Sequence, residues 1–333
     1  MNMELLTSIL TAYGATGREG CVRGVIKQAL AGHVDSMTTD AMGNLIATKK
    51  GDGTGRRIML CAHMDHIGLM VMDAEKNGFL RVCAVGGVRP ANMVAQHVVF
   101  ENGAMGVVGA DEGVKDALEI RHLYIDVGAE SREEALAIAP IGEVAVTAPR
   151  VARLGEHRIA SPAMDDRIAC YILAKTMLDL PENMKNEVVA VFSVQEEVGL
   201  RGAAAAAYSV NPDMGIALDV TLSGDTPRGH KIAVSVGKGP CVKILDRSVI
   251  CSPKAVRLME SAAERAGIEY QREVLTAGGT DAGAMQQTRA GVPCGVLSVA
   301  CRYVHSACEV ISIADAEQGA RLIAELLNHP IEL

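Results

Sequence analysis

The chain has 333 residues, enough for one large or two ordinary domains, and 49% of them are hydrophobic, which is ample for a buried core. Its net charge of -8, with no block of lysine or arginine, argues against nucleic acid or an anionic membrane surface as the partner. The first residues lack a signal-peptide pattern, no apolar run reaches membrane-spanning length, and nine cysteines without a Cys-x-x-Cys pair are typical of a reducing compartment, so we expect a cytoplasmic protein.

The first 67 residues alternate between helix and strand patterns. Helices are predicted over 4–12 and 18–31, and strands over 43–48 and 58–62. The second strand stops at His63-Met64-Asp65. Because side chains alternate along an extended chain, His63 and Asp65 should point the same way. A histidine and a carboxylate in this arrangement can serve as a metal ligand and the group that orients it.

Residues 68–161 have a different pattern. Short apolar runs are separated by Gly, Asn and Pro turns, and only 131–139 predicts a helix. The runs are 69–72, 79–85, 98–100, 105–108 and 144–147. We interpret this segment as a small β-rich insertion in a larger domain formed by 1–67 and 162–333. The alternative is an irregular extension of that same domain.

After the insertion the α/β alternation returns. Helices are predicted over 165–180, 202–208, 253–266, 281–288 and 313–327, and strands over 188–194, 214–218 and 292–300. This alternation predicts an α/β fold with a mixed, mostly parallel sheet between helices on both faces.

Polar residues that could bind metal follow the ends of these strands or precede a helix. They are His63, Asp165, Asp166, Glu196, Glu197, Asp219 and His305. Ligands of open α/β sheets collect outside the carboxyl ends of the strands, so these side chains should meet at one edge. Any one of them alone could be a helix cap or a surface residue.

The residue types also indicate a chemistry. Imidazole and carboxylate ligands suit Zn²⁺, Co²⁺ or Mn²⁺. Two histidines and three carboxylates, one from each of the three acidic segments, are too many for one tetrahedral site with an open position, and they suit two metals that share a bridging water. A further carboxylate must accept the proton of that water. The neighbours Glu196 and Glu197 could divide these roles, because adjacent side chains diverge.

Six segments together resemble the M42 metallo-aminopeptidases over nearly the whole chain. They are Ala62-His63-Met64-Asp65, Met164-Asp165-Asp166-Arg167, Glu196 to Gly202, Leu218-Asp219-Val220-Thr221, Gly278 to Ala282 and His305-Ser306. The resemblance implies a zinc-peptidase-like fold with a PDZ-like dimerisation domain at 68–161. It also implies two divalent metals held by His63, Asp165, Glu197, Asp219 and His305, with Asp165 bridging.

The remaining roles come from the same resemblance. Glu196 would be the general base beside a metal-bridging hydroxide, and Asp65 would orient His63. Substrates would be peptides with a free amino terminus, and dimers would assemble into a hollow homo-dodecamer. The tripeptide Gly279-Thr280-Asp281 could shape the substrate loop, or it could be only a turn with a helix N-cap.

Three alternatives remain open at this point. An M20-like di-zinc amidase or deacylase would use similar ligands, and dependence of cleavage on a free amino terminus distinguishes it. An endoglucanase, a label that some M42 relatives carry, is disfavoured because Glu196 and Glu197 diverge from each other and aromatic sugar platforms are scarce. A non-catalytic scaffold is disfavoured by the complete ligand set. Cys61 is expected in the strand core, and His66 is unassigned.

Overall fold

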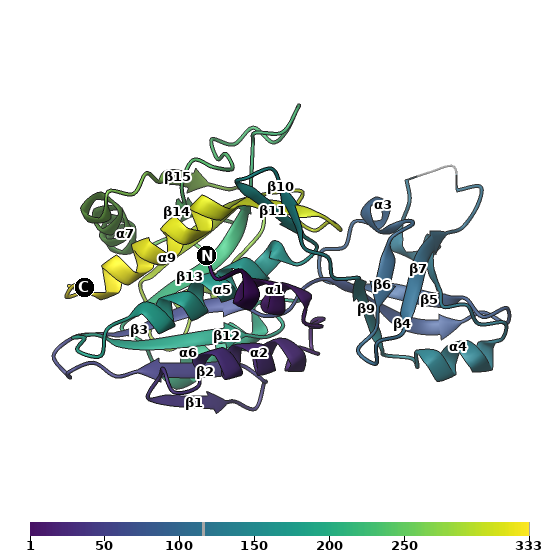
Figure 1. Cartoon of the computed structure of the whole chain (residues 1–333), viewed down its shortest axis with the longest axis horizontal. Helices are drawn as coiled ribbons and strands as arrows, with labels where there is room; N and C mark the ends of the chain where they lie inside the picture. The colour runs from purple at the N-terminus through teal and green to yellow at the C-terminus, as the bar shows by residue number, and fades with distance from the viewer. Residues whose placement is uncertain (115–116, 333) are drawn as a thin grey trace.

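The computed structural model describes residues 1–114 and 117–332. They form an α/β body with a smaller barrel beside it (Figure 1). The body contains an eleven-stranded sheet in the order β1-β2-β12-β3-β13-β16-β17-β11-β10, with β14 and β15 attached through β16. Its strands are β1 (Ser36–Thr39), β2 (Leu45–Lys49), β3 (Arg57–His63), β10 (Ala152–Leu154), β11 (Arg158–Ser161), β12 (Glu187–Ser193), β13 (Met214–Leu222), β14 (Cys241–Leu245), β15 (Gln271–Val274), β16 (Cys294–Arg302) and β17 (Glu309–Ser312).

Parallel pairing is confined to the centre of this sheet and to one side branch. The strands β12, β3, β13 and β16 run parallel to one another, as β15 does to β14. All other pairs in this sheet are antiparallel, including β2 with β12, β17 with β16 and β14 with β16. Every side chain from 58 to 62 in β3 is buried, as expected for a strand covered on both faces. The predicted α/β class with a mixed sheet is confirmed.

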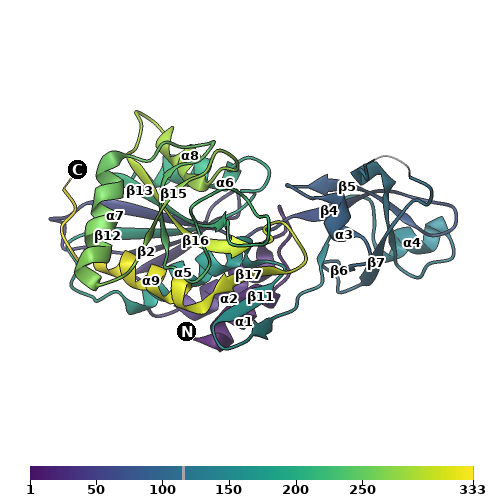
Figure 2. The ribbon, with the colours of Figure 1, turned by 90° about the horizontal axis from the view of Figure 1, so that it is seen from above.

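Helices cover both faces of the sheet. They are α1 (Met3–Thr11), α2 (Gly20–Leu30), α5 (Met164–Asp179), α6 (Arg201–Val210), α7 (Pro253–Ala266), α8 (Asp281–Gln286) and α9 (Ile313–Leu327). Helix α5 packs on β3 and β13 and contacts α1 and α9, while α6 and α8 contact each other and the sheet (Figure 2). Among the described residues, none of these helices combines the length and apolar content needed to span a lipid bilayer.

The barrel has its own core. Six antiparallel strands close in the order β4-β5-β8-β7-β6-β9, in the region expected to be PDZ-like. Its elements are β4 (Gly68–Ala74), β5 (Leu80–Val85), α3 (Pro90–Met93), β6 (His97–Val99), β7 (Met105–Ala110), η1 (Ile120–His122), β8 (Leu123–Asp126), α4 (Arg132–Ile138) and β9 (Val144–Thr147). Leu69, Val71, Leu80, Phe100 and Ile125 are buried inside it.

Two of the boundaries that differ from the sequence expectations concern the inserted unit and the site. The barrel ends with β9, whereas β10 and β11 at the end of the predicted insertion join the body's sheet, because β11 pairs with β17. The predicted strand end at 218 is wrong, because β13 pairs with β16 as far as Leu222. Asp219 therefore lies within a strand and not in the loop after it.

Candidate active site

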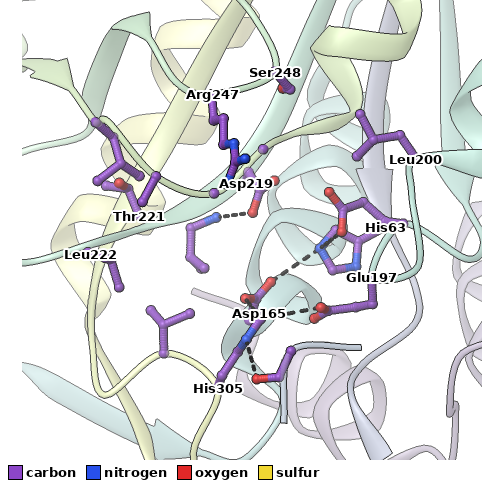
Figure 3. A pocket seen from close by; sticks show the side chains of 18 of the residues that line it. His63, Asp165, Glu197, Leu200, Asp219, Thr221, Leu222, Arg247, Ser248 and His305 are labelled. Carbon is purple, nitrogen blue, oxygen red and sulfur yellow. Dashed lines mark hydrogen bonds and ion pairs between the residues drawn. The ribbon is translucent and has the colours of Figure 1, made fainter. Parts of the chain in front are cut away.

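Five side chains from separate segments meet beside the carboxyl ends of the central strands (Figure 3). His63 ends β3, Asp165 lies at the start of α5, Glu197 follows β12, Asp219 lies in β13 and His305 lies between β16 and β17. They form two groups, His63 with Asp165 and Asp219, and Asp165 with Glu197 and His305. Within each group the candidate ligand atoms lie within 4.8 Å of one another.

Asp165 belongs to both groups and lies between the two histidines. Its Oδ1 is 3.2 Å from His63 Nε2, and its Oδ2 is 3.3 Å from His305 Nε2. The carboxylate therefore presents one oxygen to each side of the site. This is the arrangement that a bridging ligand requires.

The two imidazole rings are held in the same way. His63 Nδ1 lies 3.0 Å from the carbonyl oxygen of Asp65, and His305 Nδ1 lies 3.0 Å from the carbonyl oxygen of Gly87. A carbonyl can only accept a hydrogen bond, so we assign the proton of each neutral ring to Nδ1. In that neutral form each Nε2 carries a lone pair directed at the carboxylates, as in metal-binding histidines, and a bound cation would take the place of the proton that the carboxylates otherwise favour there.

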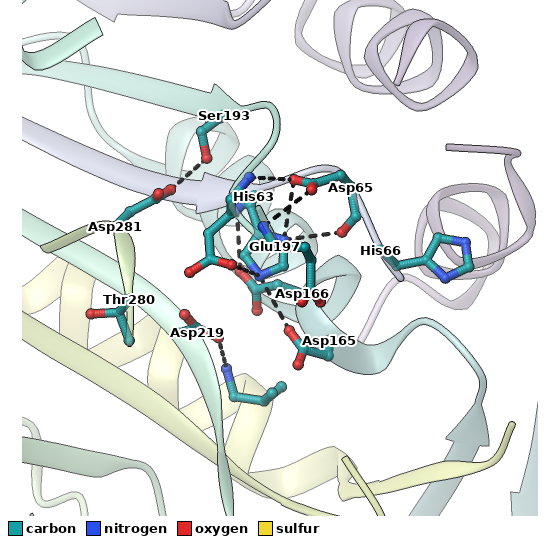
Figure 4. Close-up of polar contacts among 12 residues, drawn as sticks. His63, Asp65, His66, Asp165, Asp166, Ser193, Glu197, Asp219, Thr280 and Asp281 are labelled. Atoms are coloured by element: carbon teal, nitrogen blue, oxygen red, sulfur yellow. Dashed lines mark hydrogen bonds and ion pairs between the residues drawn. The ribbon is translucent and has the colours of Figure 1, made fainter. Parts of the chain in front are cut away.

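Asp65 is fully buried and connects three segments (Figure 4). Its carboxylate accepts hydrogen bonds from Thr16 Oγ1 at 2.9 Å and from the backbone N–H groups of Glu196 at 3.0 Å and Glu197 at 3.3 Å. It also lies 3.5 Å from His63 Nδ1. Asp65 thus contacts the His63 ring and fixes the turn that carries both glutamates.

Glu196 and Glu197 point toward different histidines. Glu196 Oε2 is 3.9 Å from His63 Nε2, and Glu197 Oε2 is 3.3 Å from His305 Nε2. Burial raises the pKa of Glu196 well above its usual value, against the opposing effect of His63, and Asp219 raises it further. A carboxyl group with a raised pKa can exchange protons nearer neutral pH.

The donor set fits divalent cations. Among the described residues, no lysine or arginine lies within 4.0 Å of the carboxylates of Asp165, Glu197 or Asp219. Although burial opposes it, Asp165 and Glu197 raise the pKa of His305 to about 11. The site therefore strongly favours positive charge, and buried carboxylates of this kind are normally paired or bound to metal. Mixed imidazole and carboxylate donors suit Zn²⁺, Co²⁺ or Mn²⁺.

These residues form the floor of a cavity of about 560 Å³. Its walls come from the body and, through Gly87 and Arg89, from the barrel. The wall residues of the body are Leu200, Val220, Thr221, Leu222, Lys243, Arg247, Ser248, Leu275, Ala277, Gly278, Gly279 and Val304. The volume lies in the usual range for small-ligand pockets.

The three residues predicted for substrate binding, Gly279, Thr280 and Asp281, do not all line the cavity. Gly279 lines the cavity. Thr280 and Asp281 are buried behind it, where Thr280 Oγ1 donates to Asp246 and Asp281 accepts from Ser193 Oγ and Cys61 Sγ. Thr280 occupies the N-cap position of α8, as the alternative expected, but its side chain makes no capping hydrogen bond. Cys61 is fully buried, as expected.

Several residues that contact the site were not identified from the sequence, among them Thr16, Gly87 and Glu309. Thr16 donates to Asp65, Gly87 accepts from His305, and Glu309 accepts from the backbone of two candidate ligands. For Gly87, the adjacent glycines Gly86-Gly87 were a usable signal, because glycines often mark places where the backbone approaches another group closely. In the structure, a Cβ at Gly87 would lie 2.5 Å from His305 Nδ1. Thr16 and Glu309 have no comparable local signal.

Known proteins resemble this chain in sequence and in fold. The family model described as M42 glutamyl aminopeptidase matches residues 43–322. The chain is 37% identical to a lysyl aminopeptidase of Pyrococcus furiosus, over 98% of this chain and 97% of that protein. Among solved structures, an aminopeptidase of Desulfurococcus kamchatkensis has a TM-score of 0.94 at 35% identity, covering 98% of this chain and 94% of that one.

A further solved structure concerns assembly. The TET1 peptidase of Pyrococcus horikoshii has a TM-score of 0.88 at 34% identity, and the match covers 98% of each chain. That protein is described as able to assemble into a tetrahedron or a large octahedral shell.

Proposed function

Because this chain belongs to the M42 glutamyl aminopeptidase family and is a peptidase, we propose that it is a metal-dependent aminopeptidase that removes N-terminal residues from peptides. The observation that supports this most directly is the position of Asp165, whose two oxygens face His63 and His305 on the floor of one cavity. In the proposal, two divalent cations, Zn²⁺ or Co²⁺ with Mn²⁺ as a further candidate, are held by His63, Asp165, Glu197, Asp219 and His305.

The protein's own groups divide the remaining work. Bound cations would supply Lewis acidity, polarising a carbonyl and lowering the pKa of water. Glu196 would accept the proton of the attacking water and return it to the leaving amine. Asp65 would hold His63 and the Glu196-Glu197 turn in place, since it contacts both. Gly279 and the other wall residues would receive the first residue of the peptide.

The activity is tested with a panel of aminoacyl-p-nitroanilides and their N-blocked analogues, each assayed with Zn²⁺, Co²⁺ and Mn²⁺. We expect cleavage of substrates with a free amino terminus and none of the blocked ones. Equal cleavage of blocked substrates would identify an amidase or deacylase of the M20 type instead. Failure to cleave any substrate with any of these metals would favour the non-catalytic scaffold.

The general base is tested with Glu196→Gln. The substitution preserves the shape of the side chain but removes its proton acceptor, so turnover should fall by roughly 10²- to 10⁴-fold while metal content stays near that of the wild type. The measurements are kcat and metal content by mass spectrometry. Glu187→Gln is the matched control, because Glu187 lies in the same strand-and-turn segment but pairs with the exposed Arg57. Unchanged turnover in the Glu196 variant would contradict the assignment.

We also propose that the chain forms a homo-oligomer, a dodecamer built from dimers that associate through the inserted unit. The assembly described for the TET1 peptidase supports a closed homo-oligomer. Light scattering after size exclusion should give a mass near twelve times 35.0 kDa. A monomer at micromolar concentration would contradict this part of the proposal without affecting the aminopeptidase assignment.

A further inference from the structure

Glu309 joins the backbones of two candidate metal ligands that are far apart in the sequence. Its Oε2 accepts from the N–H of Asp165 at 2.8 Å, and its Oε1 accepts from the N–H of His305 at 2.7 Å. Glu309 is the first residue of β17 and is only 2% exposed. Both carboxylate oxygens are therefore directed at backbone amides and not at the cavity.

The backbone at His305 requires such support. Its φ is +60°, in the left-handed region that residues with a Cβ rarely adopt, and Tyr303 two residues earlier has a φ of +63°. Tertiary contacts have to hold a segment in this conformation. At His305 there are two such contacts. Glu309 accepts a hydrogen bond from the His305 N–H, and Asn92 Nδ2 donates one to the His305 carbonyl oxygen at 3.1 Å.

Asp165 is supported by the same carboxylate. Because Asp165 lies at the start of α5, its N–H has no acceptor within the helix. Its φ of -78° and ψ of 104° are also not helical values. Glu309 supplies the acceptor for this N–H. One planar carboxylate thus determines how far the Asp165 backbone lies from the His305 backbone.

We propose that Glu309 is a positioning residue that sets the spacing of Asp165 and His305, and so shapes the group formed by Asp165, Glu197 and His305 for a divalent cation. The inference rests on the proposed metal-dependent function. Glu309 acts through the two ligands and is not itself a ligand, because its oxygens are occupied by the two N–H groups.

The test is Glu309→Gln, which keeps the size of the side chain and one acceptor oxygen but turns an NH₂ group toward one of the two amides. Residues that orient metal ligands typically affect affinity by about 10- to 100-fold, and we expect a loss in that range for one of two bound ions. Affinity is measured by chelator competition with Co²⁺ and Zn²⁺. The absorption spectrum of the Co²⁺-loaded protein reports ligand geometry, and it should change as well.

Two further variants make the test specific. Glu309→Asp keeps the charge but is one methylene shorter. Its carboxylate cannot reach both N–H groups without a shift of the backbone, so this variant should also bind the metal more weakly. Glu260→Gln is the matched control, because Glu260 is similarly buried, in α7, and bonds to Arg272 away from the site. It should leave both metal affinity and the Co²⁺ spectrum unchanged.

The outcomes separate this inference from the proposed function. A wild-type protein that binds no divalent metal would overturn both. A wild-type protein that binds two ions, with a Gln variant of equal affinity and unchanged spectrum, would overturn the role of Glu309 alone. If melting curves show that the Gln variant does not fold, the Asp variant decides, and wild-type affinity and spectrum in that variant would overturn the proposal.

Discussion

His63 and His305 show how much a single hydrogen bond determines at the residue scale. In both rings a backbone carbonyl engages Nδ1, so Nε2 is directed at Asp165. The alternation of side chains near the end of β3 suggested that Asp65 would orient His63 through its carboxylate. The nearest contact to the ring is instead the Asp65 carbonyl, and the carboxylate mainly holds the turn with Glu196 and Glu197.

His66, which had no role assigned from the sequence, is a buried neutral histidine. Burial lowers its pKa to about 3, and Arg167 contributes in the same direction. The unfolded chain binds a proton near pH 6.5, whereas the folded protein does not until about pH 3. The stability associated with the neutral ring is therefore present above pH 6.5 and is lost as the pH falls toward 3.

We predict that His66→Gln reduces the acid sensitivity of the protein. Between pH 7 and pH 5, the free energy of unfolding of the wild type should fall by about 2 kcal/mol more than that of the variant. Urea unfolding at the two pH values measures the difference. The exposed His33, replaced in the same way, is the control and should leave the pH dependence unchanged. Equal slopes for the wild type and the His66 variant would contradict the prediction.

At the scale of elements, Arg167 connects α5 to the chain that follows α1. Its fully buried guanidinium donates to the carbonyl oxygens of Ile9 at 2.8 Å and of Ala12 and Gly14, each at 3.1 Å. The last carbonyl groups of a helix have no hydrogen-bond donor within the helix, so the Arg167 side chain supplies donors at the end of α1. It also ties the start of α5, where Asp165 lies, to the N-terminal segment.

Arg167→Met should therefore destabilise the protein by about 3 kcal/mol, because buried carbonyls lose their donors while the volume is largely kept. Urea unfolding measures the change. Lys175→Met is the control on the same helix, since Lys175 pairs with the exposed Asp179 and should cost at most about 1 kcal/mol. Similar costs for the two variants would show that the three hydrogen bonds contribute little.

A second prediction at the scale of elements concerns Gly87, which lies in the loop between β5 and α3. A methyl group at Gly87 would lie 2.5 Å from His305 Nδ1, so Gly87→Ala must displace the ring or the loop. We expect metal affinity to fall at least about 10-fold with the fold intact, as for other residues that orient ligands. Chelator competition and circular dichroism measure the two properties.

Gly24→Ala is the control for this substitution. Gly24 lies inside α2 with no atom within 4 Å of the added Cβ, so the change should be neutral or slightly stabilising. A Gly87 variant with wild-type metal affinity would show that the loop can move aside without disturbing His305.

The sequence predicted the long elements better than the short ones. Helices α7 and α9 have the predicted bounds, because Pro253 and Gly267 delimit the first and the Ser312 side chain caps the second. The strands β14, β15 and β17 have four or five residues each and were not predicted. Strands this short are specified by distant partners more than by their own residues.

The candidate site could also be predicted only in part. The candidate ligands could be proposed because each follows a predicted apolar strand or precedes a predicted helix, although Asp219 lies inside β13. Their roles stay predictions. Glu309 could not be proposed, because a glutamate at the start of a strand is ordinarily a surface residue. Its two contacts depend on the antiparallel return of β17 beside β16 and β11, which no local pattern encodes.

At the scale of the whole molecule, the candidate ligands all belong to the body, while the barrel has a separate core. A ligand that binds only the folded state stabilises it, by about 2.7 kcal/mol per site at 100 times the dissociation constant. We predict that a chelator lowers the unfolding temperature of the body and leaves that of the barrel nearly unchanged. Hydrogen exchange resolved by segment measures this during heating with EDTA or with added Zn²⁺.

The opposite result would be informative about the ligands. If EDTA destabilised only segments within 68–147, the candidate ligands in the body would not be the principal metal sites. If neither part responded, the protein would not depend on metal for stability.

The Gly87 carbonyl limits how the two parts of this molecule could be recombined. A chimera that carried the inserted unit of another enzyme would have to deliver a carbonyl oxygen to His305 Nδ1, and an amide donor in place of Asn92 to the His305 carbonyl. The compatibility of a graft therefore depends on a few loop atoms next to the cavity, whereas most of the barrel is free to diverge.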